Sequence, residues 1–498
     1  LLVSFLNLEL PKTYENDPGA HRMTEIAFNG WSEASSTRES EGSKTHRGYR
    51  VPLASLGEMP ILNRVGVLMV CLLSIALLRS EATADRPNVV IVLADDLGYG
   101  DVSSFNENAA WSTPNIDRIA ANGLSFTDAH TSAAVCTPTR YGLLTGRYNW
   151  RSTRKSGGGD GYSPPLIGDE RMTIAELFRD NGYHTAMIGK WHLGWNWKLK
   201  SDRTFQYDAK IRADIDFSQA IENGPESHGF DYSYAIAASL SSPPFVYVEN
   251  SRPTSIPNAI SVNYDEKAFW RKGPIGEDFN HARALENLTN RSVAYIEDRA
   301  GDDKPFFLYC ALTAPHAPII PTTEFIGKSN TTAYGDFVLL VDAVVGQIAD
   351  AISSDKRLEN TLLIFTSDNG QSPRADFDDD ELPLAGHNGS YIFRGKKFDI
   401  FEGGHRVPFI ASWPGKIKKG TKSNETISLV DLMATAADIL NVKLPEDAAE
   451  DSYSIWPVLK GQAYSKPLRE ATAMHSDDGR FAIRKGDWKL ILWAGSGG

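Results

Sequence analysis

The sequence predicts an α/β fold in which a mostly parallel sheet is covered by helices on both faces. The first observation is a set of short, continuous apolar runs, rich in β-branched residues, as expected of strands buried on both faces. The second is that helical stretches lie between these runs, which predicts a parallel sheet. The four runs are Asn88–Ala94, Thr185–Ile188, Phe306–Leu312 and Thr361–Thr366.

The predicted helices carry start and stop signals. The stretch Thr113–Asn122 begins with a threonine cap and a proline in its first turn, and Gly123 follows it. Further helices are predicted at Thr173–Asn181, Ala282–Arg299 and Phe337–Ser353. Each stretch is long enough to connect two parallel strands.

Composition limits the class of protein. The chain has 498 residues, of which 41% are hydrophobic and 23% charged, as in a folded enzyme rather than a disordered or collagen-like protein. Its net charge of −12 argues against a nucleic-acid partner, because such binding depends on Lys and Arg neutralising phosphates.

The N-terminal region is predicted to be a targeting segment. Residues 1–58 show no sustained periodicity, and we assign them no fold. Residues 59–84 contain Arg64, the apolar run Val65–Leu78 and the small residues Ala82–Ala84, which is the pattern of a cleaved secretory signal peptide. The apolar run is about 14 residues long, against about 20 for a spanning helix. We therefore expect a secreted or periplasmic protein without a stable membrane anchor.

Polar residues follow the predicted strands. Asp95 and Asp96 come after the first run, and Asp368 and Asn369 come after the last. Because the carboxyl ends of parallel strands share one edge, these groups are expected to meet there. Three carboxylates and an amide oxygen favour Ca²⁺ or Mg²⁺ over zinc. The alternative is that they are surface turns.

The stretch around Cys136 is the most distinctive one in the chain. A thiol among small residues is often simply buried. Here, however, Arg140 follows closely, and Tyr141–Thr145 could open a helix. A helix start and an arginine form an anion-binding environment that would also lower the pKa of the thiol. The residues alone predict a reactive group beside an oxyanion site.

Cys136–Arg140 and the following Leu143–Arg147 resemble the C/S-x-P-x-R signature of type I sulfatases. The similarity extends from about Asn88 to the C-terminal end. Further matching segments are Leu93–Asp101, Thr113–Asp117, Gly189–Gly194, Ala314–His316, Thr366–Gly370 and Phe401–Pro408.

The resemblance implies an alkaline-phosphatase-like fold and a sulfatase that hydrolyses sulfate esters. It implies Asp95, Asp96, Asp368 and Asn369, together with the matured residue Cys136, as the metal site for Ca²⁺, with Mg²⁺ as the alternative ion. Cys136 would be oxidised to formylglycine by a separate maturation enzyme. One hydroxyl of its hydrate would attack sulfur, with Asp368 as a plausible base.

The resemblance also assigns roles around this nucleophile. Arg140 would hold the hydrate and the carboxylates, while Lys190 and Lys397 would bind sulfate oxygens. His316 would protonate the leaving alcohol. His192 would take the proton of the second hydroxyl, which expels sulfate and restores the aldehyde. A serine or threonine lacks that second hydroxyl and could not perform this step.

Several assignments have open alternatives. Lys396 competes with Lys397, and Ser239 is a weakly placed candidate for a sulfate-side hydroxyl because other serines adjoin it. His316 could instead be a surface histidine of a rigid loop. His387 and His405 could line the entrance or simply stabilise loops.

The tryptophans Trp191, Trp195 and Trp197 could stack on sugars, but core packing is the more frequent role of such residues. Residues 196–280 show little periodicity and are expected to form a long elaboration over the active-site mouth, where substrate choice is decided.

The domain prediction places the catalytic α/β domain at residues 85–415 and a linker, a helix and the start of a small C-terminal domain at 416–498. The helix is expected near Ser428–Leu440, and a β-hairpin at Phe481–Arg484 and Trp488–Leu492. This small antiparallel domain looks truncated by comparison with the family pattern.

The predicted substrate is a sulfated small molecule or glycan, and carbohydrate sulfates are the hypothesis that export favours. Two other classes compete with this function. One is a formylglycine-dependent phosphodiesterase or phosphonate hydrolase of the same superfamily, and the other is a non-catalytic binder of sulfated sugars in which the thiol is never converted.

Overall fold

The computed structural model describes residues 86–201, 212–375, 383, 385–463 and 465–498. The N-terminal segment 1–58 and the predicted signal peptide 59–84 lie outside the described residues. Among the described helices, none combines the length and the apolar character needed to cross a bilayer.

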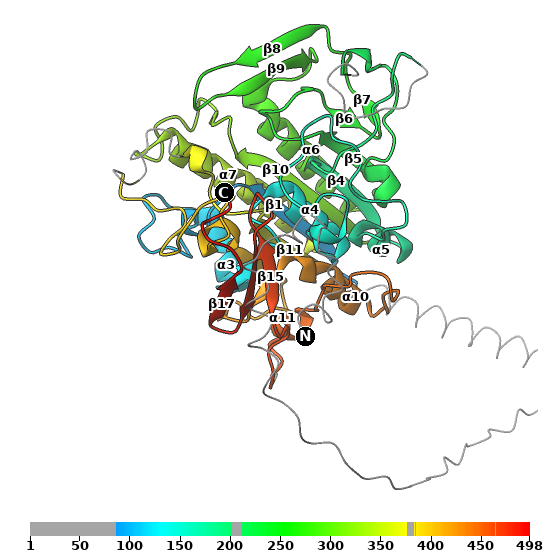
Figure 1. Ribbon diagram of the computed structural model, residues 1–498. Helices are drawn as coiled ribbons and strands as arrows, with labels where there is room; N and C mark the ends of the chain where they lie inside the picture. Colours follow the sequence, from blue (N-terminus) through cyan, green and yellow to red (C-terminus); the bar gives the residue numbers. More distant parts are fainter. Residues whose placement is uncertain (1–85, 202–211, 376–382, 384, 464) are drawn as a thin grey trace, which may run out of the picture. The chain divides into compact units, whose positions relative to one another are not determined.

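A ten-stranded sheet forms the centre of the fold, in the order β13-β2-β12-β11-β1-β10-β4-β5-β6-β7. The four predicted runs are adjacent parallel strands within it, which confirms the predicted sheet (Figure 1). Their bounds are β1 Asn88–Asp95, β4 His184–Lys190, β10 Phe306–Pro315 and β11 Thr361–Ser367.

Helices cover both faces of this sheet, because the strand residues alternate between two buried cores. In β1, Val89 and Ile91 contribute to one core, whereas Val90 and Val92 contribute to the other. The first core includes α4 Cys136–Thr145, α5 Ile174–Asp180 and α10 Leu432–Leu440; the second includes α3 Pro114–Ala121, α6 Ala284–Arg299 and α7 Ala333–Ser353.

The predicted helices agree with these bounds, with one correction. Helix α4 begins at Cys136 rather than at Tyr141. Val135 is its extended N-terminal flanking residue, and Gly146 ends it with a positive φ of 63°. Cys136 therefore occupies the first turn of the helix, one turn before Arg140.

The sequence pattern missed several short strands. Within residues 196–280, β5 pairs with β4 in parallel, so this region extends the sheet as well as elaborating the mouth. The short strands that extend the sheet are β2 Leu124–Phe126, β5 Tyr232–Ile236, β6 Val248–Glu249, β7 Arg252–Pro253, β12 Phe409–Ser412 and β13 Thr421–Ser423. Outside it are the pair β3 Ala129–His130 and β14 Ile427–Ser428, the hairpin β8 Ala259–Asn263 and β9 Trp270–Ile275, and the short helices α9 Glu402–His405 and α11 Trp456–Leu459.

A small antiparallel sheet near the C-terminus confirms that part of the predicted fold. It consists of β15 Thr472–His475, β16 Phe481–Lys485 and β17 Trp488–Ile491, of which the last two form the predicted hairpin. The domain boundary at 415/416 stays a prediction.

Gly189 allows two central strands to approach closely just before a polar residue of the site. Its φ is +121°, and a Cβ there would lie 1.8 Å from the carbonyl oxygen of Ala311 in β10. Only glycine fits this position, which sets the end of β4 and the placement of Lys190.

Arg469 ties the C-terminal segment to the helical layer. Its buried guanidinium forms an ion pair with Asp431 and donates hydrogen bonds to the Tyr148 hydroxyl at 3.0 Å and to the Asp451 carbonyl at 3.1 Å. Removing one member of such a pair leaves an uncompensated buried charge.

We predict that Arg469→Ala lowers the free energy of unfolding by about 3–5 kcal/mol, because Asp431 loses its counter-charge. Urea denaturation measures this change. The matched control is Arg357→Ala, whose side chain is 65% exposed and paired with Asp355, and which should leave stability nearly unchanged. Equal losses in the two variants would contradict the assigned role of Arg469.

Candidate active site

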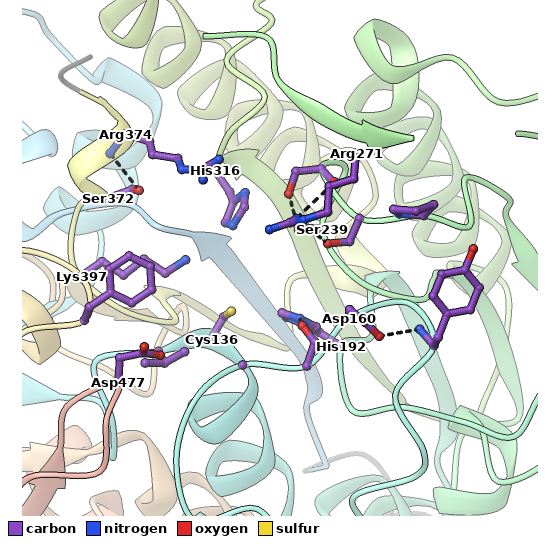
Figure 2. A pocket seen from close by; sticks show the side chains of 18 of the residues that line it. Cys136, Asp160, His192, Ser239, Arg271, His316, Ser372, Arg374, Lys397 and Asp477 are labelled. Carbon is purple, nitrogen blue, oxygen red and sulfur yellow. Dashed lines mark hydrogen bonds between the residues drawn. The ribbon is translucent and has the colours of Figure 1, made fainter. Parts of the chain in front are cut away.

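A pocket of about 370 Å³ lies at the carboxyl ends of the central strands. Five of the predicted site residues line it, and Figure 2 shows the sulfur of Cys136 pointing into it between Lys397 and His192. The five are Cys136, His192, Ser239, His316 and Lys397. The edge of the sheet therefore gathers residues that are distant in sequence.

The predicted metal-ligating residues lie together at the pocket floor. Ligand atoms of Asp95, Cys136 and Asp368 lie within 4.8 Å of one another, and so do those of Asp95, Asp96 and His316. The Asn369 amide nitrogen donates to Asp96 Oδ1 at 2.7 Å. Asp95, Asp96, Asp368 and Asn369 are buried, and His316 is partly exposed.

Each carboxylate has a cationic partner. Lys190 Nζ binds both oxygens of Asp95 at 2.9 and 2.8 Å, and Lys397 Nζ binds those of Asp96 at 2.6 and 2.8 Å. Arg140 donates from Nε and Nη2 to Asp368 Oδ2 at 3.0 and 2.7 Å. Paired charges of this kind make burial of the carboxylates tolerable.

Crowding of these groups separates their pKa values. Burial and the negative charge of Asp95 raise the pKa of Asp368 to about 6. Burial is the largest single effect on Asp95 and would raise its pKa, but the charges of Lys190, His316, Arg140 and Lys397 together lower that pKa. Three carboxylates and three buried cations thus share the pocket floor, and the charge of Asp95 still disfavours ionisation of Asp368.

A divalent cation fits this donor set. The Oδ1 atom of Asn369 is buried and has no hydrogen-bond partner among the described residues. Amide and carboxylate oxygens are the ligands of hard cations. A cation would use this unpaired oxygen and would offset the mutual repulsion of Asp95 and Asp368.

Cys136 lies at the start of α4, with Arg140 one turn further along the same face. Contrary to the sequence prediction, burial raises the pKa of its thiol, although Lys190 and Lys397 act in the opposite direction. The prediction counted the helix start and the arginine but not the loss of water around the sulfur or the nearby charges of Asp368 and Asp95.

His192 has one free ring nitrogen. Its Nε2 lies 2.9 Å from the Gly159 carbonyl oxygen and therefore carries a proton, whereas Nδ1 has no hydrogen-bond partner in the part of the chain that the structure describes. Burial and the charge of Lys190 hold the pKa of His192 well below its usual value. The neutral ring can accept a proton at Nδ1.

His316 lies above the carboxylates, and its Nε2 is 3.7 Å from Asp96 Oδ2. Its Nδ1 contacts the carbonyl oxygen of Ala317. Burial lowers the pKa of His316 to about 4, against the opposing effect of Asp96. His316 therefore lines the pocket beside Asp96, with its side chain 15% exposed, rather than lying on an outer loop surface.

Other sequence candidates are placed as follows. Ser239 lines the pocket and lies 3.0 Å from the Ser241 hydroxyl, and Lys397 lines it whereas Lys396 does not. Lys190 is fully buried behind Asp95. His387 binds Asp101 Oδ1 at 2.8 Å and does not line the pocket.

His405 and the three tryptophans belong to the interior. His405 lies 3.0 Å from His130 Nδ1, away from the pocket lining. Trp191, Trp195 and Trp197 are at most 2% exposed and pack in the core, so they do not present faces to a sugar.

The sequence pattern missed the residues around the pocket rim. Besides the predicted residues, the lining includes Asp160, Arg271, Arg374 and Asp477. These residues come from loops and from β9, with no motif around them. Charge type alone could not have selected them among the other charged residues of the chain.

Family models match most of the described chain. A model described as "Sulfatase" matches residues 87–442, and one described as "N-sulphoglucosamine sulphohydrolase, C-terminal" matches residues 389–496. The matched range contains every candidate site residue discussed above.

Individual relatives agree with these models. The chain is 34% identical over 443 residues to an N-acetylgalactosamine-6-O-sulfatase of Bacteroides thetaiotaomicron, covering 82% of this chain and 83% of the relative. It is 31% identical to an arylsulfatase of Hemicentrotus pulcherrimus, covering 84% and 70%. A solved structure from work on the metabolism of multiple glycosaminoglycans by Bacteroides thetaiotaomicron has a TM-score of 0.72 at 33% identity, covering 82% and 88%.

The raised pKa of Cys136 makes a prediction for the unconverted thiol. In folded protein made without a maturation enzyme, we expect iodoacetamide at pH 7.5 to alkylate Cys136 at least about fivefold more slowly than in urea, since little thiolate is present. Mass analysis of the tryptic peptide 119–140 measures the rate.

Cys310 provides the internal comparison. It is also buried, with a pKa raised to about 11 by burial, and it should react only in urea. Rapid alkylation of Cys136 in the folded protein at pH 7.5 would show that its thiol is activated instead.

Proposed function

Because this chain belongs to the sulfatase family, we propose that it releases sulfate from sulfated glycans through a formylglycine made from Cys136 beside a bound divalent cation. Sulfuric ester hydrolysis is the activity of the family, and the finer parts of the proposal are the nucleophile, the cation and the sugar substrate. The proposed site residues are those gathered at the pocket floor.

One observation carries the proposal. The sulfur of Cys136 and the carboxylates of Asp95 and Asp368 lie within 4.8 Å of one another at the start of a buried helix. An aldehyde formed at this side chain would therefore lie beside the proposed metal ligands. A thiol pointing elsewhere would not support this chemistry.

Asp95, Asp96, Asp368 and Asn369 are the residues that would hold the cation. Calcium fits the all-oxygen donor set best, and magnesium is the alternative. When bound, the cation would withdraw charge from sulfate oxygens and lower the pKa of a neighbouring hydroxyl. Arg140 keeps Asp368 in position through its two hydrogen bonds.

The lysines supply positive charge for a sulfate group. Lys397 lines the pocket next to Cys136, while Lys190 acts from behind Asp95. Both ammonium groups lie close enough to Cys136 for their positive charges to act on the pKa of its thiol, which each of them lowers. Ser239, on the opposite wall, is placed to donate a hydrogen bond to a sulfate oxygen.

The two histidines divide the proton transfers. His192 is the proposed base for residue 136, because its Nδ1 is free to accept a proton while Nε2 donates to Gly159. His316 is the proposed acid for the leaving alcohol, because it lies across the pocket from Cys136. The negative charge of a bound sulfate ester would raise the pKa of His316 from about 4 towards the range that this role needs.

A sulfated sugar is the proposed substrate, with a 6-O-sulfated N-acetylhexosamine as the first candidate. The names of the curated relatives support this choice. The predicted signal peptide supports a secreted or periplasmic location, where extracellular glycans are available. The proposed partner in biosynthesis is a formylglycine-generating maturation enzyme.

We predict that Cys136→Ala, expressed with the maturation enzyme, loses sulfate release by at least about a thousandfold, because the nucleophile is removed. Ion chromatography of sulfate from 6-O-sulfated N-acetylgalactosamine measures this loss. In the wild type, the peptide 119–140 should have lost one sulfur and two hydrogens and gained one oxygen.

Two results would overturn this prediction. One is full activity of Cys136→Ala, and the other is activity in a protein whose peptide retains an unmodified cysteine. Aryl phosphodiesters provide the comparison for the competing activity, and a strong preference for them would replace the proposed function.

Chelation tests the cation. We expect EDTA to abolish sulfate release and to lower the melting temperature, and added Ca²⁺ to restore both, because the crowded carboxylates lose their counter-charge. The variant Asp96→Asn should weaken Ca²⁺ stabilisation by at least about tenfold in concentration. Its matched control is Asp355→Asn, which is distant from the site.

A melting temperature insensitive to Ca²⁺ and EDTA, together with unchanged activity, would contradict a cation at these residues. Restoration by Mg²⁺ alone would identify magnesium as the ion.

A further inference from the structure

We propose that Arg271 and Arg374 form a second anion subsite on the rim of the pocket, so that the preferred substrate carries a carboxylate or another sulfate near the ester that is cleaved. This inference rests on the proposed sulfatase function and narrows its substrate class to polyanionic glycans. Lys272, the neighbour of Arg271, adds positive charge at the same rim.

The two guanidinium groups come from separate elements and meet at one ring. Arg271 belongs to β9, and Arg374 belongs to the 3₁₀ turn Pro373–Ala375. Their guanidinium carbons lie 5.9 and 5.5 Å from the centre of the Phe269 ring. Figure 2 shows the two side chains extending towards one another from opposite sides of the pocket, with His316 between them in this view.

Within the residues that the structure describes, no carboxylate forms an ion pair with Arg271, Lys272 or Arg374. The guanidinium group of Arg271 donates from Nη1 to the Ser241 carbonyl at 3.4 Å and to the Ser242 hydroxyl at 3.2 Å. At the pocket floor, by contrast, every cation has a carboxylate partner.

Because both guanidinium carbons lie within 5.9 Å of the Phe269 ring centre, the two positive charges repel each other across the rim, and an anion bound between them would relieve this repulsion. Both guanidinium groups line the pocket and keep donors free for a bidentate contact with a carboxylate or a sulfate. The floor of the pocket therefore serves the reacting ester, and the rim offers a separate set of unneutralised donors.

The position of the two rim arginines indicates that the second anionic group is attached to the alcohol part of the substrate, which leaves when the ester is cleaved. His316, the proposed acid for the departing oxygen, lies between the rim arginines and Cys136 in Figure 2. A group that reaches Arg271 and Arg374 must extend from the leaving alcohol, away from the sulfur atom that is attacked. A neutral monosulfated sugar has no charge to place there.

Three substrates that share the same ester test this subsite. They are 6-O-sulfated N-acetylgalactosamine, the same sugar linked to a hexuronic acid, and the sugar with a second sulfate. In wild type, kcat/KM should be at least about tenfold higher for one of the two dianionic substrates than for the monoanionic sugar. The preferred dianion identifies the anion as a carboxylate or a sulfate.

The double variant R271Q/R374Q should reduce that ratio to about one, mainly through KM, and each single variant should reduce it by about threefold to tenfold. Arg271→Lys and Arg374→Lys should retain part of the preference, because charge remains but the bidentate contact is lost. The control Arg357→Gln removes an arginine far from the pocket and should leave the ratio unchanged. Melting temperatures confirm that the variants are folded.

The outcomes separate this inference from the proposed function. Absence of sulfate release from all three substrates in the wild type would defeat the proposed function. Release from all three with no preference for a dianion, or a preference that survives in R271Q/R374Q, would overturn the anion subsite while leaving the sulfatase function intact. A salt-dependent preference that disappears in the double variant would support it.

Discussion

The balance of charge at the carboxyl edge of the sheet is the constraint on which the rest of the site depends. Asp95, Asp96 and Asp368 are fully buried, and each is paired with a cation. A buried carboxylate without a partner would be protonated or would destabilise the fold. These pairs also hold the carboxylate oxygens close to one another and to the sulfur of Cys136, so the residues that balance charge in the fold are also those of the proposed cation site.

The sheet supplies this balance because it brings separate parts of the chain to one edge. Parallel pairing places the ends of the adjacent strands β11, β1, β10 and β4 along one edge, and Gly189 lets β4 run close to β10. Helix α4 then contributes Cys136 and Arg140 from a single face. The proposed nucleophile and its electrostatic surroundings are thus carried by helices and strands, which suits a site that must hold charge in place.

The charged residues at the rim of the pocket are paired differently from those at its floor. Floor residues compensate one another, whereas no described carboxylate forms an ion pair with Arg271 or Arg374. Strand β9, which carries Arg271, and the 3₁₀ turn that carries Arg374 lie outside the strands that end at the pocket floor. Such an arrangement allows the leaving-group preference to change without disturbing the buried carboxylates, as expected when specificity residues are carried by surface segments.

The sequence by itself determined the parallel sheet, its four central strands, and the motif residues at their ends, because buried strands and helix caps leave local patterns. It did not determine the pKa of Cys136, which burial raises, or the interior positions of His387 and His405. It also missed β5 and the rim arginines. Those features depend on desolvation and on contacts between residues far apart in the chain, and only the tertiary structure decides which groups lose water and which charges become neighbours.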